Sequence, residues 1–220
     1  MTAIQAPPKN PNKANRMSFY VNRMLPNLQH LVMRNRQLSP YRERVVGAAE
    51  GRVLEVGIGS CLNLPFYSSQ VREVIGLEPV PRLIAMARRE PVEPPLPVIF
   101  IEGSAEEIPL DDACIDTVVI TWTLCTIPRV VQAMHEMRRV LRPGGQLLFA
   151  EHGLAPEANV RRWQDRLTPA WRRIAGGCHL NRPIRALIED NGFDIAQIDT
   201  GYIKGPKPMA FLYEGRAKRG

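Results

Sequence analysis

The chain has 220 residues, of which 45% are hydrophobic and 23% charged, and its formal net charge is +7. This composition excludes an intrinsically disordered protein and favours one globular domain with a sizeable core. No apolar run reaches the roughly 18 residues that a membrane-spanning helix needs, so we expect no membrane span.

Residues 1–14 are rich in Pro, Asn and Lys and contain no apolar stretch, which predicts a disordered tail rather than a secretion signal. We therefore expect a cytoplasmic protein. The basic segments 161–173 and 214–220 leave peripheral contact with an anionic membrane open, although a solvated surface is the simpler interpretation. Because no nucleic-acid-binding motif accompanies these charges, we expect no nucleic-acid partner.

The cysteines Cys61, Cys114, Cys125 and Cys178 include no C-x-x-C pair. In a chain of this length they are expected to be reduced thiols rather than a disulfide framework. Cys178 is followed by His179, but adjacent side chains point apart on most backbones and no second pair stands at ligand spacing. The sequence therefore predicts no metal site.

A helical cap is predicted over residues 15–50, ahead of an α/β domain over residues 51–220. Apolar residues between Arg16 and Gln37 fall on one helical face, with a kink at Pro26, and a second helix is predicted over 41–49. The cap is expected either to cover a cofactor as a lid or to pack as an ordinary part of the fold.

From residue 51 onward, short apolar runs alternate with helical patterns, which is typical of a mostly parallel sheet covered on both faces. The predicted strands are 52–56, 73–78, 98–102, 115–122, 146–151, 193–200 and 208–214, and the predicted helices are 82–90, 129–141, 157–175 and 183–191. Proline-rich residues 91–97 are expected to form a loop. The last two strands are too close in sequence for a helical crossover, so they are predicted to pair as an antiparallel hairpin.

The turn "EVGIGSC" follows the first predicted strand, where doubly wound sheets bind their ligands. Gly57 and Gly59 allow a tight turn and a close approach of the backbone to a ligand. A dinucleotide site would have a third glycine at the position of Leu62, so the fingerprint for NAD is not met.

Two carboxylates indicate which nucleotide the turn binds instead. Glu55 precedes the first glycine, where it would repel a pyrophosphate and attract a cationic amine. Glu78 ends the second predicted strand, about 20 residues after Gly57, the position from which an acid accepts hydrogen bonds from ribose hydroxyls. A ligand with a ribose and positive charge is therefore expected, and S-adenosylmethionine has both.

The sequence resembles the class I S-adenosylmethionine-dependent methyltransferases between about Arg52 and Phe149. The resemblance is carried by "VLEVGIGS", "VIGLEP", "EGSAEEIPLDDACIDTVV" and "VLRPGGQLLF", in that order. It implies a Rossmann-like, doubly wound, seven-stranded α/β sheet whose last strand is antiparallel. The sequence departs from the family at Cys61, where glycine is usual; we expect this residue to sit in the first turn of a helix with ordinary dihedral angles.

The resemblance and the turn together define the candidate site. We expect the cofactor S-adenosylmethionine to contact Glu55, Gly57, Gly59, Cys61, Glu78, Pro79, Ala105, Glu106, Thr121 and Trp122. His152 follows the fifth predicted strand and is the candidate catalytic residue, as a base or as the group that stabilises a thiolate. A histidine that only orients its loop is the alternative for this position, whereas Asp116 is expected to be structural.

Outside the core of the domain, "TWTLCTI", "FAEHGL", "LTPAW" and "GGCHLNR" are similar to the mammalian microsomal thiol S-methyltransferases and their bacterial relatives. The resemblance implies a small-molecule methyl acceptor, with a thiol favoured because it needs only to lose a proton. Unlike the mammalian proteins, the chain does not begin with an apolar anchor.

Three alternatives stay open at this point. One is an N-methyltransferase of phospholipid head groups that docks on anionic membrane through its basic segments. Another is a non-catalytic partner protein that binds S-adenosylmethionine, and the third is an NAD-dependent oxidoreductase. The sequence does not predict the oligomeric state.

Overall fold

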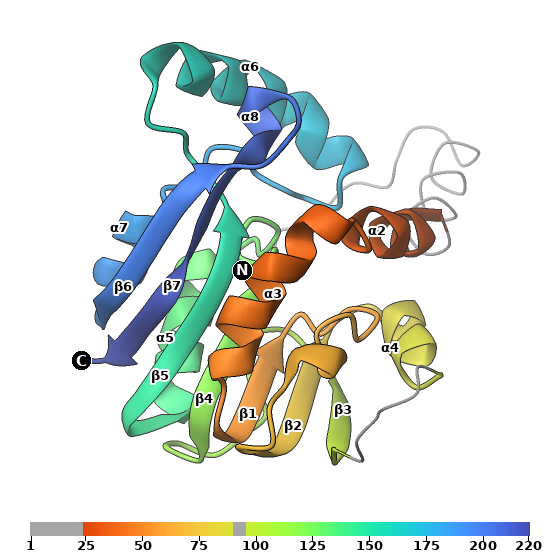
Figure 1. Cartoon of the computed structure of the whole chain (residues 1–220), viewed down its shortest axis with the longest axis vertical. Coiled ribbons are helices and arrows are strands. Elements are labelled where there is room, and N and C mark those ends of the chain that lie inside the picture. Colours follow the sequence, from red (N-terminus) through yellow and green to blue (C-terminus); the bar gives the residue numbers. More distant parts are fainter. Residues whose placement is uncertain (1–23, 90–95) are drawn as a thin grey trace, which may run out of the picture.

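Seven strands form one mixed sheet in the computed structural model, which describes residues 24–89 and 96–220 (Figure 1). Their order is β3-β2-β1-β4-β5-β7-β6. β1 to β5 are parallel, and β7 lies antiparallel between β5 and β6. The predicted seven-stranded sheet and its C-terminal hairpin are thereby confirmed. The strands are β1 (Gly51–Val56), β2 (Val71–Glu78), β3 (Val98–Glu102), β4 (Ile115–Thr121), β5 (Leu141–His152), β6 (Phe193–Tyr202) and β7 (Phe211–Arg219).

Helices cover both faces of this sheet (Figure 1). α3 crosses one face, while α5 and α7 lie behind the other. The helices are α2 (Leu25–Met33), α3 (Ser39–Val45), α4 (Pro81–Ala87), α5 (Val130–Val140), α6 (Ala158–Ile174), α7 (Ile184–Glu189) and α8 (Lys207–Ala210), with short 3-10 helices at Arg36–Leu38, Val46–Ala48 and Leu64–Phe66.

The central strands are buried on both faces, which is why they read as continuous apolar runs. In β1, Val53 packs on the α3 side and its neighbour Leu54 on the α5 side, and both are fully buried. Val118 and Val119 of β4 divide between the two sides in the same way. The period of two in a strand therefore supplies a core on each face of the sheet.

The carboxyl edge of the parallel strands is the end at which α2 and α6 lie (Figure 1). Strand order reverses at the pair β1 and β4, because β2 and β3 extend the sheet on one side and β5 on the other. A ligand crevice is expected outside the strands at such a point. The turn after β1 and the segment after β4 both begin there.

At the opposite edge, the carboxylate of Asp116 connects three strands. It accepts hydrogen bonds from the Arg52 backbone N–H at 2.7 Å, from Arg72 Nη2 at 2.8 Å and from Arg142 Nη1 at 2.5 Å. Arg52, Arg72 and Arg142 belong to β1, β2 and β5. The expected structural role of Asp116 agrees with these contacts.

Several element boundaries differ from the sequence-based prediction. The predicted strand 208–214 starts too early, because Lys207–Ala210 form α8 and β7 runs over Phe211–Arg219. β5 begins at Leu141, directly after α5, because Leu141 pairs with Ile115 before the register shifts and the regular pairing resumes at Gln146. The segment between β1 and β2 forms the 3-10 helix Leu64–Phe66 instead of an α-helix. The predicted tail 1–14, the first part of the cap up to residue 23 and most of the loop 91–97 lie outside the described residues, so the predicted division into tail, cap and domain stays a prediction.

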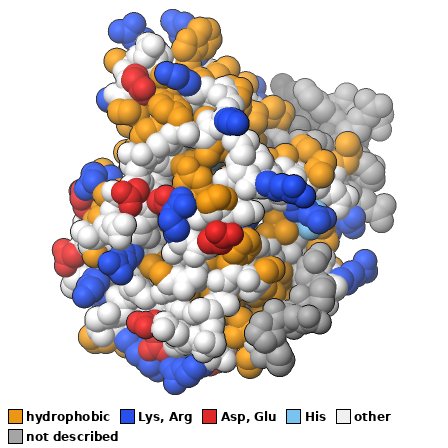
Figure 2. Space-filling model, in the orientation of Figure 1, with side chains coloured by type: hydrophobic (Ala, Val, Ile, Leu, Met, Phe, Trp, Pro, Cys, Tyr) orange, Lys and Arg blue, Asp and Glu red, His pale blue; other side chains and the backbone are white. Residues whose placement is uncertain are grey.

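On the face shown in Figure 2, Lys and Arg side chains are spread among acidic and apolar ones and do not gather into one patch. Apolar side chains of α2 are exposed, among them Leu31 at 70% and Val32 at 57%. Within residues 24–89 and 96–220, every helix is too short or too polar to cross a bilayer.

Candidate functional site

The turn after β1 is fastened to β2 and pressed against the segment after β4. The Leu77 carbonyl accepts from the N–H groups of Gly57 and Ile58 at 2.8 Å and 3.2 Å. Gly57 has a φ of 74°, and a Cβ there would lie 2.4 Å from Thr123 Oγ1. Near Gly59, with a φ of 56°, the closest atom to such a Cβ would be 3.9 Å away. The first glycine therefore permits packing, and the second leaves space beside the loop.

Cys61 adopts a φ of 64°, in the left-handed region. The expectation of ordinary dihedral angles in a helical turn is wrong, because the chain enters a 3-10 helix only at Leu64. A side chain in this conformation costs about 1 kcal/mol or more relative to glycine. The residue is 3% exposed and packs into the core on the α3 side, so its side chain does not project from the turn into solvent.

Glu78 lies at the end of β2, where its carboxylate orders the turn. Oε2 accepts from the Gly59 N–H at 3.0 Å and Oε1 from the Val80 N–H at 3.0 Å. Each oxygen keeps a lone pair with which to accept a ribose hydroxyl. Burial raises the pKa of Glu78 to about 7, and the two backbone N–H groups oppose this shift.

Glu55 lies at the centre of a buried polar network. Its carboxylate accepts from Asn63 Nδ2 at 2.8 Å and from the Tyr67 hydroxyl at 2.8 Å. Asn63 Oδ1 in turn accepts from Arg42 Nε at 2.9 Å. Burial raises the pKa of Glu55 to about 7, while Tyr67, Asn63 and Arg42 lower it. These contacts connect β1, the turn and α3; the predicted contact of Glu55 with a cofactor amine stays a prediction.

The end of β4 closes the other side of the turn. Thr121 Oγ1 accepts from Asn63 Nδ2 at 3.0 Å. Trp122 has a φ of 49°, and its ring lies 4.8 Å from the Arg42 guanidinium carbon. Strained backbone of this kind persists only where the surroundings fix it, and it concentrates at functional sites. The structure thus brings Thr121 and Trp122 to the same edge as Glu55, Gly57, Gly59 and Glu78.

Three further residues that are predicted to contact the cofactor make no direct contact with the turn in the interactions described above. Pro79 follows Glu78 and is exposed, and Ala105 is buried in the α5-side core. The Glu106 carboxylate accepts from the Arg129 backbone N–H at 2.7 Å and from its guanidinium at 2.8 Å. Glu106 therefore orders the start of α5, and its predicted contact with the adenine stays a prediction.

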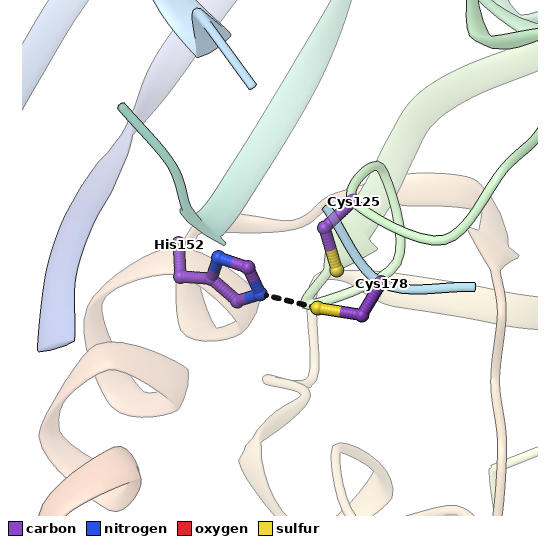
Figure 3. A group of neighbouring side chains, drawn as sticks. All are labelled: Cys125, His152 and Cys178. Carbon is purple, nitrogen blue, oxygen red and sulfur yellow. Dashed lines mark hydrogen bonds between the residues drawn. The ribbon is translucent and has the colours of Figure 1, made fainter. Parts of the chain in front are cut away.

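His152 ends β5 and points toward two sulfur atoms (Figure 3). Its Nε2 lies 2.9 Å from Cys178 Sγ, and Trp171 Nε1 donates to the same sulfur at 3.3 Å. The Cys125 thiol and His152 lower the pKa of Cys178, against the effect of burial. For His152, burial disfavours the cation, but the contact with Cys178 outweighs it and raises the pKa. Together these shifts favour a thiolate beside an imidazolium.

Glu151 connects the His152 cluster to the segment after β4. Its Oε1 accepts from the backbone N–H groups of Thr123 and Leu124 at 2.7 Å and 2.9 Å. The residue is fully buried, and burial raises its pKa to about 7. This carboxylate therefore fixes the loop that runs from Trp122 to Cys125.

Several residues of this site were not predicted. His30 of α2 contacts Ser60 of the turn, with 2.7 Å between Nδ1 and Oγ, so part of the cap touches the predicted cofactor loop. Arg42 and Asn63 carry no motif, and Cys178 was considered only with its neighbour His179. His152 and the cysteines are visible in the sequence, but their spacing does not indicate which of these side chains lie together.

Comparison with known proteins agrees with this geometry. Residues 54–149 match the family described as a methyltransferase domain. The chain is 32% identical to the human thiol S-methyltransferase TMT1B over 76% of the chain and 69% of that protein. It is 36% identical to a phosphatidylethanolamine N-methyltransferase of Cereibacter sphaeroides, over 49% of the chain and 53% of that protein.

Solved structures show the same fold. An S-adenosylmethionine-dependent methyltransferase of Mesorhizobium loti superposes with a TM-score of 0.62 at 15% identity, over 84% of this chain and 99% of that one. The chain belongs to the class I S-adenosylmethionine-dependent methyltransferases. S-adenosylmethionine is therefore its cofactor, and the NAD-dependent alternative is set aside.

The left-handed conformation at Cys61 makes a prediction about stability. Cys61→Gly and Cys61→Ala both remove the sulfur and differ only in Cβ. We expect the glycine variant to be more stable by about 1 kcal/mol, since only alanine retains the strain, and to bind S-adenosylmethionine as tightly as the unaltered chain or more tightly. Urea unfolding and isothermal titration measure both quantities. Equal stability of the two variants would show that position 61 is unstrained.

Loss of the Glu78 carboxylate tests the assignment of the ribose. Glu78→Ala is expected to weaken S-adenosylmethionine binding by about 1–3 kcal/mol, through lost hydrogen bonds to ribose hydroxyls. Isothermal titration gives the affinity, and Glu50→Ala, at an exposed carboxylate just before β1, is the control. Unchanged affinity in the Glu78 variant would mean that the ribose binds elsewhere.

The raised pKa of Glu78 predicts a pH dependence of nucleoside binding. An ionised carboxylate only accepts hydrogen bonds, so a ligand that donates ribose hydroxyls binds better as Glu78 loses its proton. Because 5′-methylthioadenosine does not titrate near neutrality, it is a suitable probe. Its affinity is expected to rise by up to about tenfold between pH 6 and 8. In Glu78→Gln this rise should shrink; an affinity that falls with pH would contradict the assignment.

Proposed function

We propose that the protein transfers the methyl group of S-adenosylmethionine to the sulfur of a small, fairly apolar thiol. The observation that carries the proposal is the contact between His152 Nε2 and Cys178 Sγ at the carboxyl end of β5. The contact supports the proposal because it shows an imidazole bonding to a sulfur atom at the same edge of the sheet as the predicted cofactor residues. The similarity to thiol S-methyltransferases supports the same acceptor class.

The residues around His152 suit a sulfur nucleophile better than an oxygen nucleophile. S-adenosylmethionine supplies an electrophilic methyl group, and the protein has only to align the acceptor and exclude water. A thiol has a pKa of about 8.5 and ionises with little help. An alcohol has a much higher pKa than a thiol and needs a stronger base than an imidazole. His152 then favours the thiolate form of the acceptor.

The region around His152 is withdrawn from water but contains charged as well as aromatic groups. Trp171 lies against Cys178, and the buried guanidinium of Arg182 interacts with Cys125, Glu151 and Cys178. Water excluded from such a region cannot compete for the methyl group or solvate the nucleophile. A small thiol suits such a region better than a bulky acceptor does.

A panel of acceptors tests the proposal. Thiols, amines, phenols and vesicles containing phosphatidylethanolamine are incubated with labelled S-adenosylmethionine, and methylated products are identified by mass spectrometry. We expect methyl transfer to thiols. His152→Ala should lower kcat/KM for the thiol by about tenfold or more and leave the affinity for S-adenosylmethionine unchanged. His135→Ala, at an exposed position of α5, is the matched control.

Each other outcome has a defined meaning. Transfer to phosphatidylethanolamine alone would show that the protein is an N-methyltransferase of phospholipid head groups instead. A protein that binds S-adenosylmethionine but methylates none of these acceptors would favour a non-catalytic partner. Full thiol activity in His152→Ala would remove His152 from the catalytic step.

A further inference from the structure

Three side chains that can bind metal ions converge at the carboxyl edge of the sheet (Figure 3). Cys125 comes from the segment after β4, His152 from the end of β5 and Cys178 from the turn after α6. Their ligand atoms, Sγ, Nε2 and Sγ, all lie within 4.8 Å of one another. The two cysteines are 2% and 7% exposed. Two buried cysteines and a half-buried histidine form a specific arrangement, since the three residues are far apart in the sequence.

The separations fit a tetrahedral ion. Zinc–sulfur bonds of about 2.3 Å and zinc–nitrogen bonds of about 2.0–2.1 Å place neighbouring ligand atoms about 3.5–3.8 Å apart. The observed contact of 2.9 Å between His152 Nε2 and Cys178 Sγ is shorter than this, and no pair exceeds 4.8 Å. Side-chain movements of about 1 Å would therefore form three bonds to one ion.

The charge and hardness of the three groups select the ion. Two thiolates and a neutral imidazole balance a divalent cation, so the buried assembly carries no net charge. Thiolate and imidazole ligands favour zinc over calcium or magnesium, which prefer oxygen. Calcium and magnesium are thereby excluded as occupants.

Surrounding contacts orient the ligands from outside. Trp171 Nε1 donates to Cys178 Sγ at 3.3 Å, as outer groups do around metal-bound thiolates. The Cys125 carbonyl accepts from the His179 backbone N–H at 2.9 Å. This bond joins the two cysteine-bearing segments, so the positions of both sulfurs depend on the same backbone contact.

We propose that Cys125, His152 and Cys178 bind one thiophilic divalent cation of the zinc type, with the fourth coordination position open to the acceptor. Three protein ligands and an open position are the pattern of catalytic rather than structural zinc sites. Binding of the ion follows from the three side chains alone. Coordination of the acceptor rests on the proposed thiol methylation.

The chemical step balances with the ion bound. The acceptor thiol loses its proton to solvent as its sulfur coordinates the cation. The thiolate then forms a carbon–sulfur bond to the transferred methyl group, and the bond between that methyl and the sulfonium breaks with its electron pair. The products are a thioether and the neutral sulfide S-adenosylhomocysteine, and the cation is unchanged.

Cobalt substitution tests the ion and its ligands directly. The reduced full chain is freed of metal with a chelator and titrated with Co²⁺. We expect one ion per chain and a thiolate-to-cobalt charge-transfer band in the near ultraviolet. The band should weaken in Cys125→Ser and in Cys178→Ser and vanish in the double variant. Cys114→Ser changes a cysteine outside the cluster and should leave the band intact.

A second measurement needs no variant. Zn²⁺ should protect Cys125 and Cys178 of the unaltered chain from alkylation by iodoacetamide, with Cys114 as the unprotected reference in the same digest. A cobalt spectrum without a thiolate band would overturn the metal site. So would alkylation of Cys125 and Cys178 in the metal-free chain, under mild denaturant that opens the site, that Zn²⁺ fails to reduce.

The acceptor position is tested separately. Adding a small thiol to the cobalt-loaded protein should shift the charge-transfer band, whereas an alcohol of the same shape should not. If the ion binds through Cys125 and Cys178 but the thiol leaves the spectrum unchanged, the open position is wrong and the metal site stands. Methyl transfer to thiols at an undiminished rate after metal removal would uphold the proposed function and overturn the catalytic role of the ion.

Discussion

The buried interaction of Glu55 with Asn63 and Arg42 positions the turn after β1 relative to the sheet and to the end of α2. Glu55 and Arg42 are 1% and 4% exposed, so a carboxylate and a guanidinium are both withdrawn from water on either side of one amide. Burial alone would make each charge costly, and the hydrogen bonds through Asn63 offset that cost. Arg42 also donates to the Met33 carbonyl at 2.9 Å. The sheet, the turn after β1 and the end of α2 are therefore fixed relative to one another by a single network.

Strain near the turn follows from this constraint. Cys61 and Trp122 both adopt left-handed backbone conformations that their side chains disfavour. They flank the network: Asn63 follows Cys61 by two residues, and the Arg42 guanidinium lies over the Trp122 ring. Residues in such conformations persist where their neighbours leave no alternative. The two strained residues therefore lie at the point where the network joins the turn to the β4 segment.

Local patterns in the sequence were sufficient to predict the sheet. Alternating apolar runs and helices specify a doubly wound topology. The short link between β6 and β7 allows only an antiparallel hairpin. The glycine turn and the position of Glu78 beside it could be predicted because their spacing follows from backbone geometry. The role of Arg42 was not predicted. Arginine in an amphipathic helix is usually exposed, and the sequence gives no sign that this side chain is buried against Asn63. The grouping of Cys125, His152 and Cys178 depends on how three connections fold back, which no local pattern encodes. The shape of the turn at Cys61 was missed for a related reason, since the positive φ there is imposed by the packing around it.

The edge of the sheet divides into two chemical environments that one carboxylate connects. Carboxylates and hydroxyls surround the turn after β1, which suits a cationic nucleoside, whereas sulfur, imidazole and indole groups surround the end of β5. Glu151 precedes His152 on β5 and accepts hydrogen bonds from the backbone N–H groups of Thr123 and Leu124 in the segment after β4. Thr123 in turn packs against Gly57. A displacement of the sulfur side would therefore be transmitted to the turn through two direct contacts. In-line methyl transfer tolerates little error in the distance between nucleophile and methyl group. This connection across β4 would therefore couple the positions of the predicted cofactor residues to those of the proposed acceptor residues.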